Sequence, residues 1–208
     1  MMNSSKAEGR STREAARSHS DRFRPFGTVR CSNPSYFRNQ LARDLGCLLD
    51  VDDSAVAWCC RPHGMDDILL DIGWKGPPPD FLVSYPNGRD VYLHAVEGEG
   101  DPEVTEAAAC RRLSHRYVRA SEITAGFRLR NAKDLLRYAN YQTPLGDRIR
   151  LLAALEQEGS ATVAECLSVF REIPPMAGLS SLILNRFVAV DLDAALIAPH
   201  TVVRVFGS

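Results

Sequence analysis

The fold is decided by the stretch Pro79-Asp80-Phe81-Leu82-Val83, which is followed by the turn Pro86-Asn87-Gly88 and then by Val91-Tyr92-Leu93-His94-Ala95-Val96. Two alternating apolar runs joined by a Pro-Asn-Gly turn predict a β-hairpin. Asp80 begins the first strand, and His94 and Val96 project from the second. The hairpin therefore places one carboxylate at the head of a strand, opposite a histidine on the next.

Hydrolysis of a phosphodiester bond with a divalent metal ion needs a set of groups that such a hairpin can carry. One carboxylate at the head of a strand, with an acidic residue and a lysine two positions apart on the next, converges on the ion and its water. Asp80 is the only member of this set that the hairpin supplies. The sequence thus has the layout of an active site without most of its groups.

Composition indicates a folded protein with few candidates for a catalytic lysine. The chain has 208 residues, 45% of them apolar, which is enough to bury a core. Its net charge of -1 argues against a protein that coats nucleic acid. Its basic residues comprise 22 arginines and only three lysines, Lys6, Lys75 and Lys133.

Residues 1–30 form a basic segment that we expect to be a disordered tail. They carry seven Lys or Arg against three acidic residues and almost no aliphatic residue. Such a segment cannot offset its own ordering entropy by burial. Two roles remain open for it: an arm that contacts DNA phosphates, or a leader that improves solubility.

The cysteines and the apolar segments suggest a cytoplasmic location. Six cysteines occur without paired C-x-x-C spacing, and the N-terminus lacks the apolar run of a secretory signal. The most apolar segment, 179–206, is interrupted by charged and polar residues, so we expect no membrane span.

Residues 31–142 are predicted to form an α/β (α+β) domain. Apolar residues spaced by three and four predict a helix at 34–49, and a short strand follows at 56–60. After the hairpin, a helix is expected at 102–117 and a strand at 117–123. This α-β-β-β-α-β order predicts a mixed sheet flanked by helices.

Residues 143–208 are predicted to form a second, smaller domain. A helix at 131–141 closes the first domain, and Pro144 marks a break. The expected elements that follow are helices at 148–158, 162–170 and 176–186 and strands at 187–191 and 201–205. Three helices and a two-stranded ribbon are the winged-helix plan, with Ser160 capping the second helix and the third helix as the recognition helix.

Several stretches of the chain resemble a known family, the TnsA-like transposon endonucleases. The matching stretches are Leu41-Ala42-Arg43-Asp44 with Leu48-Leu49-Asp50-Val51-Asp52, Pro79-Asp80-Phe81-Leu82-Val83 with its Asn87-Gly88 turn, and Ser121-Glu122-Ile123 with the segment 129–138. The resemblance implies a restriction-endonuclease-like core, a C-terminal winged helix, Mg²⁺ as cofactor, and DNA, a transposase and an ATPase as partners.

The resemblance also implies a degraded catalytic site. The family's helix glutamate falls on or near Asn39, its aspartate on Asp80, and its Glu or Gln with the following Lys on His94 and Val96. The lysine orients or activates the attacking water, and valine can do neither. Rescue would require His94, or Glu97 or Glu99 beyond the strand, to act with Asp80 as metal ligand or base. The competing interpretation is that His94 is a hydrogen-bonded structural residue and that 97–100 is a solvated turn.

The predicted recognition helix offers few polar side chains for DNA, Arg186 among them, so docking of a partner protein is at least as good an interpretation of the C-terminal domain as DNA contact. A denser basic set is a candidate phosphate track: Arg111, Arg112, Arg116, Arg119, Arg128 and Arg130. The sequence therefore favours a catalytically impaired subunit that binds DNA ends and partner proteins. The alternative is an active metal-dependent endonuclease with a rearranged site around Asp80. A third alternative is a decayed gene product that has kept a fold but no role.

Overall fold

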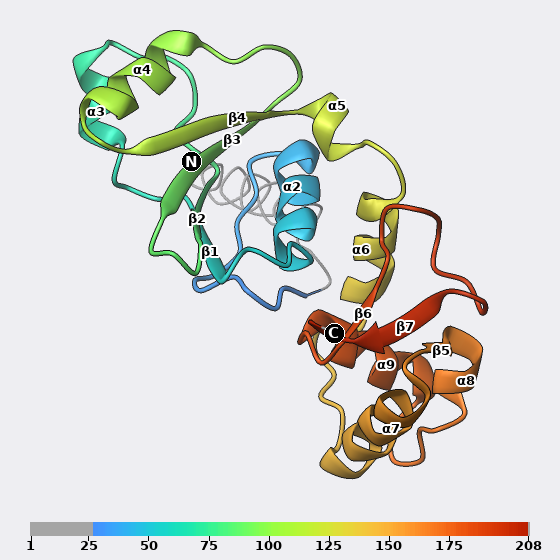
Figure 1. The fold of residues 1–208 in the computed structure, drawn as a ribbon. Coiled ribbons are helices and arrows are strands. Elements are labelled where there is room, and N and C mark those ends of the chain that lie inside the picture. The colour runs from blue at the N-terminus through green and yellow to red at the C-terminus, as the bar shows by residue number, and fades with distance from the viewer. Residues whose placement is uncertain (1–26, 208) are drawn as a thin grey trace, which may run out of the picture.

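The structure is a computed structural model that describes residues 27–207, and Figure 1 shows their two lobes. The predicted tail lies outside the described residues except at its end. There the backbone amides of Val29 and Arg30 donate to Oδ1 of Asp50 at 3.2 and 2.9 Å. Residues 27–30 therefore belong to the fold, because a buried carboxylate at the end of a helix fixes their backbone.

The N-terminal lobe is built on a four-stranded mixed sheet with the order β1-β2-β3-β4. The strands are β1 Ala57–Cys60, β2 Phe81–Ser84, β3 Asp90–Val96 and β4 Ser114–Arg119. The first three pair antiparallel, while β4 runs parallel to β3. Gly88 in the β2–β3 turn has φ +72°, a conformation that favours glycine, so the predicted hairpin is confirmed.

Helices cover both faces of this sheet (Figure 1). On one face lies α2 (Gln40–Asp50), whose leucines pack with Trp58 in a single buried cluster. On the other lie α3 (Asp66–Asp71) and α4 (Pro102–Cys110), which pack around Tyr92. The mixed sheet flanked by helices is thus confirmed, although α3 was not predicted because six residues are too few to show a helical period.

Several predicted boundaries in this lobe are wrong: the helix expected at 34–49 begins only at Gln40, and the helix expected at 131–141 spans Arg128–Leu136. The helix expected at 102–117 ends early, because Arg112 adopts φ +58° and turns the chain into β4. The strand expected at 117–123 begins and ends earlier, and Ala120–Ile123 instead forms the short helix α5. Pairing stops there because β3 ends at Val96, opposite Arg119.

The C-terminal lobe carries an antiparallel three-stranded sheet with the order β5-β7-β6. Its elements are α7 Leu145–Glu158, β5 Ala161–Thr162, α8 Val163–Leu167, α9 Pro175–Leu184, β6 Val188–Val190 and β7 Val202–Val205. The three helices and two final strands were predicted, whereas β5 is too short to be seen in the sequence. Thr162, not Ser160, caps α8, because Thr162 forms a reciprocal capping box with Glu165.

The two lobes share a buried cluster centred on α6 (Arg128–Leu136). Leu135 packs there with Cys47 of α2 and Leu184 of α9. The buried Asn131 amide donates to the carbonyl oxygens of Leu192 and Ala195, both at 2.8 Å. The contact between the lobes is apolar, and the Asn131 side chain within it has all its hydrogen bonds made. It therefore resembles the core of a domain more than a transient interface.

No helix within residues 27–207 has the length and apolar character needed to cross a membrane.

Candidate functional site around Asp80

The hairpin holds Asp80 where the sequence predicted it, immediately before β2. Its backbone amide donates to the Leu93 carbonyl at 2.8 Å, which continues the strand pairing. Its carboxylate is only 4% exposed and accepts a hydrogen bond from the amide of Ala95 at 2.9 Å. The aspartate is therefore a buried charge, and such a charge requires a partner.

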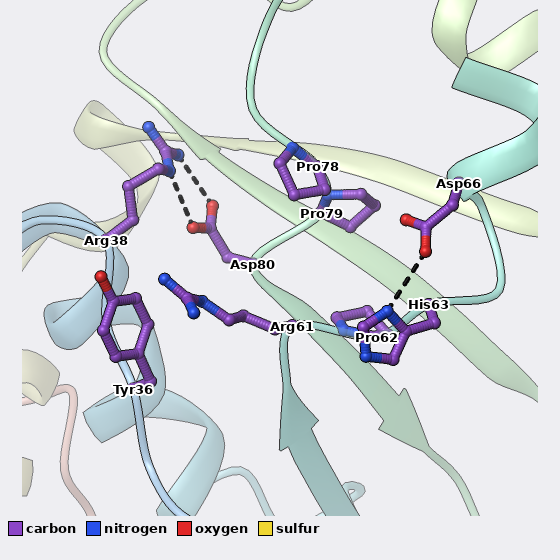
Figure 2. A pocket seen from close by; sticks show the side chains of 9 residues that line it. All are labelled: Tyr36, Arg38, Arg61, Pro62, His63, Asp66, Pro78, Pro79 and Asp80. Carbon is purple, nitrogen blue, oxygen red and sulfur yellow. Dashed lines mark hydrogen bonds and ion pairs between the residues drawn. The ribbon is translucent and has the colours of Figure 1, made fainter. Parts of the chain in front are cut away.

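That partner is Arg38, which lies just before α2. Its Nε donates to Oδ1 of Asp80 at 3.0 Å and its Nη2 to Oδ2 at 2.9 Å, as Figure 2 shows. Nη2 also donates to the carbonyl of Ala95 at 2.9 Å. Both carboxylate oxygens thus face a cation supplied by the chain itself, and a divalent ion could bind Asp80 only by displacing this guanidinium.

The other residues considered for the predicted catalytic set do not supply its groups. Asn39 caps α2 by accepting a hydrogen bond from the amide of Ala42 at 2.8 Å, so its side chain has a structural role. Val96 is half-buried at the end of β3. Lys133 pairs with Asp44 at 2.8 Å, away from the hairpin.

His94 is a buried structural residue with both ring nitrogens occupied. Nε2 lies 3.0 Å from the Pro77 carbonyl, which can only accept, so Nε2 carries the proton. Nδ1 lies 2.8 Å from Nε2 of His115 and accepts from it. The ring also stacks on Tyr117, with centroids 5.2 Å apart. His94 is therefore not free to bind a metal ion or to act as a base.

His115 completes a chain of neutral groups. Its Nδ1 lies 2.9 Å from the hydroxyl of Thr105, which donates to it. Burial lowers the pKa of His94 and lowers that of His115 to about 4, with the neighbouring His94 adding to the second shift. Both rings are therefore neutral at pH 7, and no sequence pattern predicted that they would be neighbours.

The acidic residues beyond β3, Glu97 and Glu99, are exposed and line a separate cavity of about 420 Å³ together with Asn39, His94 and Val96. Glu97 is exposed, and Glu99 accepts a hydrogen bond from Nη1 of Arg119 at 2.7 Å. Across residues 27–207, no group of three or more His, Cys, Asp or Glu side chains is placed to hold a metal ion. The residues present around Asp80 do not fit Mg²⁺, because an arginine already occupies the carboxylate.

Most arginines of the predicted phosphate track already have partners in the fold. Four pair with carboxylates: Arg111 with Asp71, Arg116 with Glu122, Arg119 with Glu99 and Glu122, and Arg128 with Asp193. Arg186 donates to the carbonyls of Asp52 and Ala55. Arg112 and Arg130 are exposed and make no ion pair with the described residues.

The predicted recognition helix α9 is largely buried. Ser180 and Ser181 are 1% and 3% exposed, so neither can reach a base edge. The hydroxyl of Thr143 donates to the Gly178 carbonyl at 2.9 Å, so the segment between the lobes crosses this helix. Only Asn185, at its end, is both polar and exposed.

Cys31 and Cys60 form a thiol pair that sequence spacing did not reveal. Cys31 lies in a single parallel bridge to Trp58 of β1, two positions before the buried Cys60. A hydrogen bond from the Cys60 thiol is the main cause of a lowered pKa at Cys31. Burial instead raises the pKa of Cys59, which precedes Cys60 in β1 and faces the opposite side of the sheet.

This contrast predicts thiol reactivity. At neutral pH, Cys31 should react with iodoacetamide several-fold faster than Cys59, because the thiolate is the nucleophile. Peptide mapping by mass spectrometry after short exposures measures both rates. The substitution Cys60→Ala should slow Cys31, and equal rates for Cys31 and Cys59 in the wild type would contradict the prediction.

A cavity of about 370 Å³ opens beside the Arg38–Asp80 pair (Figure 2). Tyr36, Arg61 and three prolines form its walls, with His63 and Asp66 at one end. The sequence did not predict Arg38, Tyr36 or Arg61 as site residues. The only signal that could have pointed to the two arginines is that the chain is rich in arginine and that the predicted site lacks its lysine.

No protein-family model and no curated protein sequence matches this chain. Its function is therefore argued from these residues and contacts.

Proposed function

We propose that the chain is a TnsA-like, non-catalytic subunit that binds DNA ends and partner proteins in a transposition-type assembly. The first lobe, through α6, corresponds to the restriction-endonuclease-like core, and α7 to β7 to the winged helix. The observation that carries this proposal is the bidentate pairing of Arg38 with Asp80.

The chemistry of a guanidinium explains why this pairing favours a non-catalytic role. A divalent ion lowers the pKa of bound water and polarises the phosphate, whereas a guanidinium has no site at which water can be ionised. A guanidinium can still attract and orient phosphate. Arg38 thus retains a positive charge at the former metal position without the means of cleavage.

The lobe arrangement supports DNA contact through the first lobe. Helix α9 is buried against its surroundings, and Arg186 at its end is used between the lobes. Arg112 and Arg130 remain exposed on the first lobe. We infer that the C-terminal lobe contributes to docking of partners, with a transposase and an ATPase as the expected ones.

The first test combines cleavage and binding on the same samples. Supercoiled plasmid is incubated with Mg²⁺ or Mn²⁺ and either the wild type or Asp80→Asn, and binding is followed by gel shift. We expect DNA binding without nicking by both proteins. Cleavage that Asp80→Asn abolishes would show an active site rebuilt around Asp80 and would overturn the proposal.

The same gel shift locates the DNA surface. Arg112→Ala with Arg130→Ala should weaken binding about tenfold and reduce its salt dependence, because each removes a charge available to phosphate. Arg111→Ala is the matched control, since its charge already pairs with Asp71 at 2.8 Å. Equal effects of the two changes would place the DNA elsewhere.

A further inference from the structure

The cavity beside Asp80 is lined by one arginine, Arg61, that has no carboxylate partner among the described residues. Arg38 and Asp80 cancel each other, whereas Asp66, whose carboxylate lies 3.2 Å from Nδ1 of His63, adds a negative charge at one end of the cavity. Arg61 makes no ion pair within residues 27–207, and its contact is with the ring of Tyr36, 3.3 Å from the centroid. Among the arginines that line the cavity, Arg61 is thus the one without a carboxylate partner, and its N–H donors are available to a ligand.

The backbone holds Arg61 in an unusual conformation. Its φ is +51°, in the left-handed region that few residues other than glycine adopt, and Pro62 follows it. Its amide donates to the Asp80 carbonyl at 3.1 Å, which ties this strained turn to the hairpin. Backbone strain of this kind persists where the surrounding structure requires it, and it is common at binding sites.

The side chains in Figure 2 show the result of this conformation. Arg61 extends along the cavity toward Tyr36, and its guanidinium lies on the same side as the Arg38–Asp80 pair. Pro78 and Pro79 form a wall across from it. The cavity therefore combines an arginine fork with flat apolar walls.

This combination selects a class of ligand. Guanidinium groups bind phosphate through paired hydrogen bonds, and aromatic or proline surfaces pack against a sugar or a base. A volume of about 370 Å³ is at the small end of ligand pockets, sufficient for one nucleotide and too small for a double helix. A terminal nucleotide could enter it, whereas the interior of a duplex could not.

We propose that this cavity binds the 5′-phosphate of a single nucleotide, either at a DNA end or as a free nucleotide, with Arg61 as the principal contact. This inference deepens the DNA-end function proposed above and rests on it for the DNA source. The ion pair of Arg38 and Asp80 fixes the floor of the cavity, and Tyr36 holds the Arg61 guanidinium in place.

Two probes test the proposal in the full-length chain. Fluorescence anisotropy compares duplexes of one sequence, labelled at the 3′ end, that carry either a 5′-phosphate or a 5′-hydroxyl. We expect the phosphorylated duplex to bind about tenfold more tightly. Calorimetric titration with a deoxynucleoside 5′-monophosphate and with the matching nucleoside measures the free-nucleotide source.

The test variant and its control carry the same Arg→Gln substitution at two different positions. Arg61→Gln should remove the preference for the 5′-phosphate and leave the affinity for the hydroxyl duplex unchanged. Arg89→Gln is the matched control, because Arg89 also stacks on a tyrosine, Tyr85, but does not line the cavity. Unchanged thermal unfolding of both variants confirms that they fold.

The outcomes separate this inference from the proposed function. Duplex binding with no preference for the 5′-phosphate, and no binding of the monophosphate, would overturn the inference and leave the DNA-binding function standing. Binding of the monophosphate that Arg61→Gln abolishes, without any duplex binding, would support the cavity and overturn the DNA-end function. A preference that survives in Arg61→Gln would also overturn the inference.

Discussion

Replacing Arg38 with methionine is expected to lower the free energy of unfolding by about 3 kcal/mol, because it leaves the Asp80 carboxylate buried without its cation. Asp80 would retain only the hydrogen bond from the Ala95 amide. Methionine preserves most of the side-chain packing, so the loss reports on charge and hydrogen bonds rather than on a cavity. Urea unfolding followed by circular dichroism measures it.

Two further variants make this prediction specific. Arg111→Met removes an ion pair of similar length, 2.8 Å, between side chains that are 61% and 60% exposed, and should cost less than about 1 kcal/mol. The double variant Arg38→Met with Asp80→Asn should be more stable than Arg38→Met alone, because the uncompensated charge is gone. A cost below 1 kcal/mol for Arg38→Met would show that Arg38 does not neutralise Asp80 in solution.

The hairpin and the helix order could be predicted because their signals are local. Alternation in β2 and β3, the Asn87-Gly88 turn and the leucine spacing of α2 all depend on neighbours in the chain. The misplaced strand at 117–123 shows where local signals end. Its true limit is set by the end of β3, which is a contact between distant segments.

The sequence predicted Asp80 as a residue of the candidate site, but it did not predict the residues that contact Asp80. Arg38 and Asp80 are 42 positions apart, and no sequence pattern relates an arginine before one helix to an aspartate before a strand. For His94 the sequence left two interpretations open, a metal ligand or base and a hydrogen-bonded structural residue, and the structure confirms the second but with a partner that was not predicted, His115 on the adjacent parallel strand. Pairs of this kind arise from register, which one sequence does not fix.

The histidine pair makes a second large prediction, that stability falls as pH decreases from 7 to 4. Both folded-state pKa values lie below the value of about 6.5 that an unfolded histidine has. Above pH 6.5 neither state takes up a proton. Below it the unfolded chain is protonated first, so the free energy of unfolding decreases until the pH reaches the folded pKa, which for His115 is about 4.

The size of this effect follows from the shift at His115. A change from 6.5 to about 4 corresponds to about 3 kcal/mol at 1.36 kcal/mol per unit. Because the ring is only partly buried, solvent screening reduces the expected loss to about 2 kcal/mol. Urea unfolding at several pH values between 7 and 4 measures it.

Carboxylates also titrate near pH 4, so the comparison that isolates the pair uses variants. His115→Gln removes this titration but keeps a side-chain amide that can donate to Nδ1 of His94. Between pH 7 and 4 the free energy of unfolding of this variant should fall by about 2 kcal/mol less than that of the wild type. His200→Gln is the control, because His200 is exposed, and it should follow the wild type. If His115→Gln and the wild type lose stability in parallel, the two rings are not held neutral by the fold, and the chain of hydrogen bonds from Pro77 to Thr105 does not persist in solution.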